Sequence, residues 1–202
     1  MYDRNYDTGT IQMKKTFPAW IPNWSKLGFI YYQSISTKDA KFIFDSCAEA
    51  NPKKIFEIGT GKGKSTYCLL AASDCSVITL DKRNSTFQDA SEHIDTERMI
   101  KHEKTSSEDY FNLTVTRNID FWFIDANLYL CEIPHIFLRS TANFTVVLHD
   151  YWVDGDTVRD EKGKQNYDAL KQFALINNYS IEEHYGATCC IELKFSHKLN
   201  IV

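Results

Sequence analysis

The stretch Phe56-Glu-Ile-Gly-Thr-Gly-Lys-Gly-Lys-Ser-Thr66 follows an apolar run at 53–58 and precedes a helical pattern. A glycine-rich turn therefore links a buried strand to a helix. Gly59, Gly61 and Gly63 can adopt positive φ angles and let the backbone approach a ligand, and a helix start offers unpaired N–H groups. The stretch predicts a site for a nucleotide-like ligand; a tight strand-to-helix turn without a ligand is the alternative.

Glycine-rich loops differ in the spacing of their glycines, and two known types do not fit this stretch. The phosphate loop GxxxxGK[ST] matches at Gly63-Lys64-Ser65, but its first glycine would fall at Ile58. The dinucleotide fingerprint GxGxxG would place its third glycine at Lys64, where a side chain obstructs helix–strand packing. The pattern that remains is acidic-x-Gly-x-Gly-x-Gly, which begins at Glu57 and ends at Gly63.

The length of 202 residues, with 43% hydrophobic and 25% charged residues, predicts one globular domain. Residues 1–35 are rich in aromatics and prolines with little periodicity, so we expect an N-terminal aromatic arm followed by a domain at 36–202. The arm carries four large aromatic side chains that could cover a pocket or a partner subunit: Trp20, Trp24, Tyr31 and Tyr32. Self-association as a homo-oligomer stays open.

Charge and cysteine usage exclude several classes of partner. The net charge of −4 and the pI near 5.9 argue against a nucleic-acid partner, because such affinity comes from clustered Lys and Arg. We find no apolar stretch of about 18 residues and no signal-peptide layout at the N-terminus, so we expect a cytoplasmic protein with no membrane partner. The six cysteines form neither CxxC pairs nor Cys/His groupings, which predicts reduced thiols.

Hydrophobic periodicity predicts strands alternating with helices, and hence an α/β fold with a doubly wound, mostly parallel, seven-stranded sheet. The predicted strands are 53–58, 76–80, 99–104, 119–124, 144–148 and two final strands that flank Gly186-Ala187 as a hairpin. The predicted helices are 36–51, 63–72, 85–95, 106–111, one that starts near Pro134, and 166–177. The polar stretch 153–164 is predicted to be a mobile loop at the sheet edge.

Polar side chains follow several of the predicted strands. Asp81, Asp125 and His149-Asp150 each come directly after a buried strand. In doubly wound sheets, ligands bind at these carboxyl ends, near the point where the strand order reverses. Asp81 lies about 20 residues past the glycines, where a carboxylate can accept hydrogen bonds from both ribose hydroxyls. Its alternative role is that of a turn or N-cap residue.

Together these motifs resemble class I S-adenosylmethionine-dependent methyltransferases, and in particular the small-molecule O-methyltransferases with a strand-four motif like FIDGDHSY and a strand-five motif ending in HD. In this chain the two motifs are FWFIDANLY at 121–129 and VVLHDYW at 146–152. The resemblance covers residues 53–152. It implies a Rossmann-like methyltransferase fold with a C-terminal antiparallel hairpin, S-adenosylmethionine as cofactor, and methylation of a hydroxyl on a small molecule such as a sugar or a phenol-like metabolite.

The resemblance also implies site residues. Those expected to bind the cofactor are Glu57, Gly59, Thr60, Gly61, Gly63, Ser65, Thr66, Asp81, Ser106 and Asp125. Within this set Asp81 would hold the ribose, and Ser106 would lie near the adenine.

Methyl transfer requires alignment of a nucleophilic oxygen with the methyl group and removal of one proton. We expect His149 to accept that proton, because its unperturbed pKa lies near neutrality; the alternative is that the ring only bonds backbone. Asp125 and Asp150 are expected to assist, either by holding a divalent cation such as Mg²⁺ or by orienting His149 or the substrate. Asn127 and Tyr151 replace carboxylate or amide side chains that metal-assisted relatives often carry, which weakens the metal hypothesis.

Three other functions stay open. A P-loop-like NTPase is the strongest alternative. The sequence GKST is present at 63–66, and FWFID at 121–125 resembles the apolar strand with a terminal Asp that such enzymes use to bind magnesium. A nucleic-acid or protein methyltransferase is less favoured, because Ala126-Asn127-Leu128-Tyr129 lacks the prolines of the DNA amino-methylating motif. A non-catalytic module that retains a cofactor pocket is the third.

Overall fold

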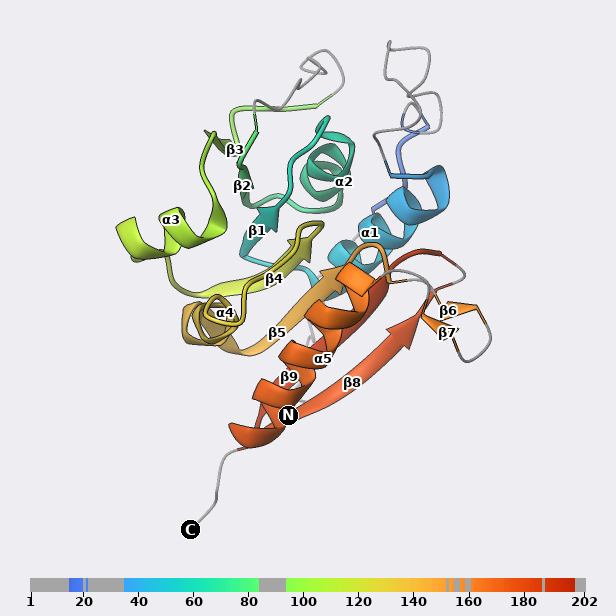
Figure 1. Ribbon diagram of the computed structural model, residues 1–202. Coiled ribbons are helices and arrows are strands. Elements are labelled where there is room, and N and C mark those ends of the chain that lie inside the picture. Colours follow the sequence, from blue (N-terminus) through green and yellow to red (C-terminus); the bar gives the residue numbers. More distant parts are fainter. Residues whose placement is uncertain are drawn as a thin grey trace, which may run out of the picture.

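The computed structural model describes residues 15–19, 21, 35–83, 94–151, 153–154, 157–158, 161–186 and 188–198. They form a seven-stranded sheet with the order β3-β2-β1-β4-β5-β9-β8 (Figure 1). Its strands are β1 (Lys54–Ile58), β2 (Ser76–Asp81), β3 (Met99–Glu103), β4 (Ile119–Ile124), β5 (Ser140–Leu148), β8 (Tyr179–Tyr185) and β9 (Ile191–His197). A separate two-stranded ladder joins β6 (Val153–Asp154) to β7 (Thr157–Val158).

The sheet is parallel from β3 through β5, and β9 then pairs antiparallel with both β5 and β8. The predicted fold class, doubly wound with a C-terminal antiparallel hairpin, is confirmed. Along the chain, the sheet grows from β1 through β2 to β3 on one side. The chain then crosses to the other side of β1, where it adds β4 and β5. The order therefore reverses between β1 and β4, and the carboxyl ends of these two strands form the switch point where ligands bind in such sheets.

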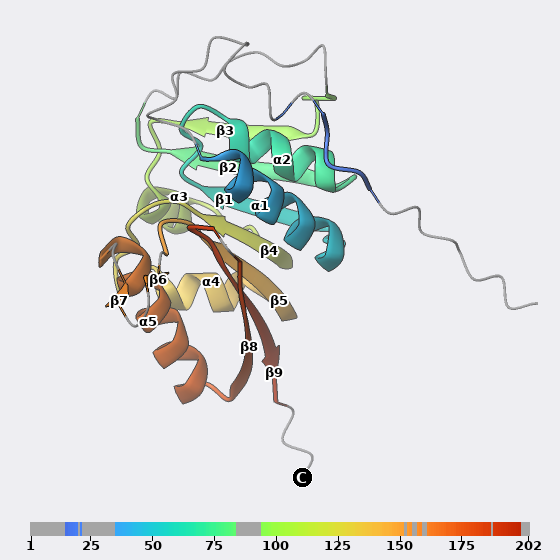
Figure 2. The same ribbon diagram turned by 90° about the vertical axis from the view of Figure 1, so that its right-hand side faces the viewer.

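Helices cover both faces of the sheet (Figure 2). The helices α1 (Thr37–Ala50) and α2 (Lys64–Ala72) pack on one face, over strand residues such as Ile55, Phe121 and Phe123. The helices α3 (Ser107–Leu113), α4 (Ile133–Arg139) and α5 (Glu161–Ile176) cover the other face, over strand residues such as Phe56 and Trp122. Neighbouring strand residues thus point to opposite cores, which explains why these strands are mostly apolar on both faces.

Most element boundaries follow the sequence prediction, but two predictions around the last helix are wrong. Residues 153–164 were expected to be a loop, whereas β6 and β7 form a ladder and α5 begins at Glu161, five residues before the predicted start at 166. The polar composition of the segment predicted a loop, yet in the structure Gly163 allows α5 to pack closely on the end of β5. β5 also begins earlier than predicted, at Ser140.

The N-terminal arm is described only at 15–19, at Ile21 and at Ile35. Phe17 meets Phe44 of α1 edge-on, with 5.4 Å between the ring centroids, and Ile21 is fully buried in the same core. The four arm aromatics named above and most of the predicted helix 85–95 lie outside the described residues. The arm boundary at residue 35 stays a prediction.

All six cysteines are free, as predicted. Among the described helices, none combines the length and the apolar character needed to cross a bilayer.

Candidate active site

The glycine loop after β1 has the backbone conformation that its sequence predicted. Gly59, Gly61 and Gly63 have φ angles of 99°, 53° and 85°. A Cβ atom on Gly59 would lie 2.5 Å from the carbonyl oxygen of Asp125, so this glycine permits the close approach of the loop to the end of β4. Among the described residues, no atom lies within 4 Å of a Cβ built on Gly61. The loop is therefore anchored at its base and open at its tip.

A buried polar cluster supports this loop from beneath. Glu57 is fully buried, and its carboxylate accepts hydrogen bonds from the hydroxyls of Ser65 (2.6 Å), Thr66 (2.5 Å) and Thr79 (2.5 Å). Burial raises the pKa of Glu57 to about 7, although the three hydroxyls oppose this shift. The hydroxyl of Thr60 also contacts that of Thr79. Four predicted cofactor residues thus hold the loop to β2 and α2, and their direct contact with a ligand stays a prediction.

Asp81 at the end of β2 lies beside the open tip of the loop. Its Oδ2 accepts a hydrogen bond from the N–H of Gly61 at 2.8 Å, and its Oδ1 accepts one from the N–H of Arg83 at 2.8 Å. Ser106 lies after β3 and caps α3, where its hydroxyl accepts from the N–H of Asp109 and donates to the Asp109 carboxylate. Asp81 is therefore next to the loop, while the Ser106 hydroxyl is engaged in a helix cap.

The ends of β4 and β5 bring the predicted catalytic residues together. His149 Nδ1 lies 3.2 Å from Asp125 Oδ1 and 3.2 Å from Asp150 Oδ1. Two described groups contain ligand atoms close enough for a metal: Asp125 with His149 and Asp150, and Asp39 with His149 and Cys190. The structure thus adds Asp39 to the predicted residues.

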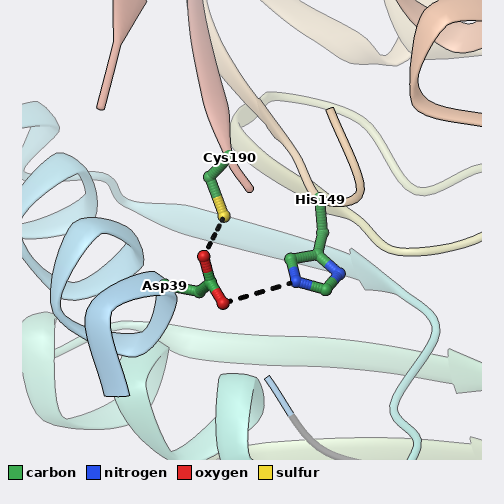
Figure 3. Close-up of side chains that lie close together, drawn as sticks. All are labelled: Asp39, His149 and Cys190. Carbon is green, nitrogen blue, oxygen red and sulfur yellow. Dashed lines mark hydrogen bonds and ion pairs between the residues drawn. The ribbon is translucent and has the colours of Figure 1, made fainter. Parts of the chain in front are cut away.

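Asp39 approaches the other edge of the His149 ring from the first turn of α1 (Figure 3). Its Oδ2 lies 3.8 Å from His149 Nε2, and its Oδ1 accepts a hydrogen bond from the N–H of Cys189 at 2.9 Å. Cys190 Sγ lies 4.0 Å from the same oxygen. Burial raises the pKa of the Cys190 thiol well above its usual value.

The carboxylates on both sides keep the His149 ring charged. Burial alone would lower the pKa of His149, but Asp125 and Asp39 outweigh burial and raise it to about 10. Burial likewise opposes ionisation of Asp39, yet His149 and Ser36 lower its pKa to about 2. The pKa of Asp125 is lowered too, because His149 and Lys162 outweigh the effect of burial. At neutral pH, an imidazolium lies among ionised carboxylates.

Lys162, in the first turn of α5, supplies a second cation. Its Nζ lies 2.9 Å from Asp125 Oδ1 and also contacts Asp150 Oδ2. Asp125 and Asp150, predicted as metal ligands, thus both contact an ammonium group. Burial opposes the charge of Lys162, but Asp125 and Asp150 outweigh it and raise its pKa.

Sequence reasoning missed both Asp39 and Lys162. The pattern Ser36-x-x-Asp39 is a capping signal, and the structure confirms a capping box at the start of α1. That signal explains Asp39 as a cap and says nothing of a histidine 110 residues later. Lys162 lay in a segment predicted to be a loop, so no pattern linked it to Asp125.

Lys64, which completes the GKST sequence, is not available for a phosphate. It is buried, and its Nζ donates a hydrogen bond to the carbonyl oxygen of Ile35 at 2.8 Å. Phosphate loops need this ammonium at the ligand. The contact therefore argues against the NTPase alternative.

Solved structures with the same fold include several methyltransferases. A putative caffeoyl-CoA O-methyltransferase from Staphylococcus aureus is 19% identical, with a TM-score of 0.65, over 89% of this chain and 93% of that one. An O-methyltransferase from Bacillus cereus, solved in complex with SAH, is 17% identical, with a TM-score of 0.63, over 87% and 88% of the two chains. The O-methyltransferase TomG from Streptomyces achromogenes, in complex with SAM, is 17% identical, with a TM-score of 0.61, over 92% and 93%.

The chain has the fold of these structures. At such identities the likeness concerns the fold, and it confirms the Rossmann-like methyltransferase architecture implied by the motifs. Neither models of protein families nor curated protein sequences gave a match.

Proposed function

We propose that this protein is an S-adenosylmethionine-dependent methyltransferase that acts on a hydroxyl of a small molecule. One observation carries the proposal: at the switch point of the sheet, a glycine loop with an open tip at Gly61 lies beside the Asp81 carboxylate. Two structures with the same fold were solved with SAH or SAM. A loop open to a ligand, with an acidic group at the neighbouring strand, suits the adenosyl group of that cofactor.

The loop would bind the cofactor mainly through its backbone. Gly59, Gly61 and Gly63 leave room for the ligand, Thr60 and the Glu57 cluster fix the loop, and Asp81 would accept hydrogen bonds from the ribose. Asp81 already accepts one hydrogen bond from Gly61, so the carboxylate is oriented before the ligand arrives. Ser106 would lie at the adenine end.

The charged cluster at β4 and β5 would bind the acceptor. We propose that His149 accepts the hydroxyl proton in its neutral form, with Asp125 and Asp150 orienting the ring. A general base works best when its pKa lies near the operating pH. The neighbouring carboxylates raise the pKa of His149 to about 10, so the neutral ring becomes available as the pH rises. The proposed acceptors are sugars and phenol-like metabolites.

Binding and turnover test the proposal separately. Isothermal titration calorimetry should detect S-adenosylmethionine and its demethylated product, but not ATP. Mass spectrometry should then detect transfer of a labelled methyl group to members of a panel of phenols and sugars. Binding of ATP with no binding of the methyl donor would overturn the proposal.

The variant His149→Ala tests the proton acceptor. It should keep cofactor affinity and lower turnover about a hundredfold or more, which is a typical general-base contribution. Because a base with a pKa of about 10 must first lose its proton, the wild-type rate should rise with pH up to about pH 10. Unchanged turnover in the variant would remove His149 from the mechanism.

We also propose that the protein acts in the cytoplasm, since its six cysteines are free. Nucleic acid is not favoured as a substrate, because the chain carries a net charge of −4.

A further inference from the structure

We infer that Lys162 is the resident cation of the acceptor site: its ammonium group binds Asp125 and Asp150 where a divalent metal would bind, so the site works without a metal. This inference concerns the donor atoms of the site, and only its activity experiment rests on the proposed function.

The contacts of the two carboxylates carry the inference. Asp125 Oδ1 lies 2.9 Å from Lys162 Nζ and 3.2 Å from His149 Nδ1. Asp150 contacts Lys162 through Oδ2 and lies 3.2 Å from His149 Nδ1 through Oδ1. Each carboxylate therefore lies beside two nitrogen atoms, one from Lys162 and one from His149. A metal held by Asp125 and Asp150 would have to displace the ammonium group or lie against it.

The charges of the cluster make that displacement unfavourable. The ammonium group of Lys162 lies against both Asp125 and Asp150. A divalent cation would gain little from carboxylates that are already paired, and it would be repelled by this ammonium group.

The position of Lys162 is built into the backbone. A Cβ atom on the next residue, Gly163, would lie 2.2 Å from the carbonyl oxygen of Asp150 and 2.8 Å from the nitrogen of Tyr151. Only glycine allows the first turn of α5 to lie this close to the end of β5. Asp150 has a φ angle of 59°, which directs its carbonyl oxygen toward that turn. Close packing of two backbones therefore delivers the ammonium group to the carboxylates.

Lys162 acts as a positioning residue in this arrangement. It holds Asp125 and Asp150 on either side of His149, which a bound metal would otherwise do. An arginine could keep the charge, whereas a methionine keeps most of the length and removes the charge.

Metal binding gives the decisive test, and it needs no substrate. Mn²⁺ titrated into the full chain and followed by electron paramagnetic resonance should show weak binding to the wild type. Lys162→Met should bind Mn²⁺ at least about tenfold more tightly, because it frees two carboxylates. The double variant K162M/D150N should lose this gain, and Lys162→Arg should behave like the wild type. Binding of Mn²⁺ by the wild type as tight as by K162M would overturn the inference.

The activity experiment uses labelled S-adenosylmethionine with and without a chelator. Transfer by the wild type should be unaffected by the chelator, and K162R should retain more turnover than K162M. Loss of transfer on chelation, restored by Mg²⁺, would overturn the inference.

If no acceptor is methylated under any condition, the proposed function fails, while the Mn²⁺ titration still decides the role of Lys162. Circular dichroism verifies the fold of each variant, and if K162M does not fold, tight Mn²⁺ binding by the wild type still overturns the inference.

Discussion

Two regions at the carboxyl edge of the sheet are built on different principles. The glycine loop and its support come from neighbouring residues at 57–66, with Asp81 and Thr79 from the next strand, and the loop shape depends on backbone angles. The charged cluster draws side chains from α1, the ends of β4 and β5, and α5. One region is a local backbone structure, and the other is a long-range assembly of charges.

The difference predicts how each region fails. Close backbone contacts at a positive φ angle, as at Gly59, leave no room for a Cβ atom, so the base of the loop should be sensitive to a single methyl group. The charged cluster should tolerate changes in size and respond to pH and charge. Variants of the two regions can therefore be compared in one set of measurements, and the largest effects are expected in the loop.

Gly59→Ala should have the largest effect. The added Cβ would lie 2.5 Å from the Asp125 carbonyl oxygen, at a φ angle of 99° that alanine rarely adopts. We expect a loss of about 3 kcal/mol or more of the free energy of unfolding, measured by urea denaturation, because neither backbone segment can move away easily. Cofactor affinity should fall in parallel.

Gly61→Ala is the matched control for that variant. Its φ angle is 53° and no described atom lies within 4 Å of the new Cβ, so the stability loss should be about 1 kcal/mol. If the cofactor lies over the loop tip, calorimetry should still show a loss of affinity of about tenfold or more. Equal stability losses for the two variants would contradict the proposed difference between base and tip.

Glu57→Ala should cause the next largest loss of stability after Gly59→Ala. It removes the acceptor of three buried hydroxyl groups, from Ser65, Thr66 and Thr79, and leaves a cavity. We expect a loss of about 2 to 3 kcal/mol in the free energy of unfolding. Glu57→Gln keeps an acceptor and the side-chain volume, so it should stay within about 1 kcal/mol of the wild type.

The pH dependence of these two variants sharpens the test. Since the pKa of Glu57 is raised to about 7, the folded protein holds a proton that the unfolded chain has lost. The stability that this proton provides falls as pH rises from 4.5 through 7. Glu57→Gln should lack this component in denaturation measured across that range. The same slope in the glutamine variant would contradict the raised pKa.

The sequence allowed prediction of the fold and the loop because their signals are local. Apolar strands, helix caps and alternate glycines each act over a few residues, and Gly59 with Asp81 lies within one strand–helix–strand unit. The cluster at His149 brings together residues that lie far apart in the chain: Asp39 contacts His149, and Lys162 contacts Asp125 and Asp150. The role of Gly163 could not be predicted, because its close packing against Asp150 is a tertiary contact with no local pattern.

Denaturation at alkaline pH should reveal the charged cluster. The pKa of His149 is raised to about 10, so its stabilising contribution is complete below pH 6.5 and is lost as pH rises through 10. We expect the wild type to lose about 2 kcal/mol more than His149→Gln between pH 7 and pH 10. Glu57→Gln in the loop should follow the wild type over this range. Parallel curves for wild type and His149→Gln would show that the cluster does not hold the proton on His149.

Ser36→Ala should give a small effect, and it should be confined to the charged cluster. The Ser36 hydroxyl accepts a hydrogen bond from the Asp39 N–H at 3.1 Å, and the Ser36 N–H donates to the Asp39 carboxylate at 3.0 Å. Loss of this cap should lower the free energy of unfolding by about 1 kcal/mol. Because the variant loosens only Asp39 and the start of α1, affinity for S-adenosylmethionine should be unchanged, while turnover should fall modestly.

Lys41→Ala, which removes an exposed ion pair with Asp45 on the same helix, should change stability by less than about 0.5 kcal/mol. A loss of cofactor affinity in Ser36→Ala would mean that the two regions are coupled rather than independent.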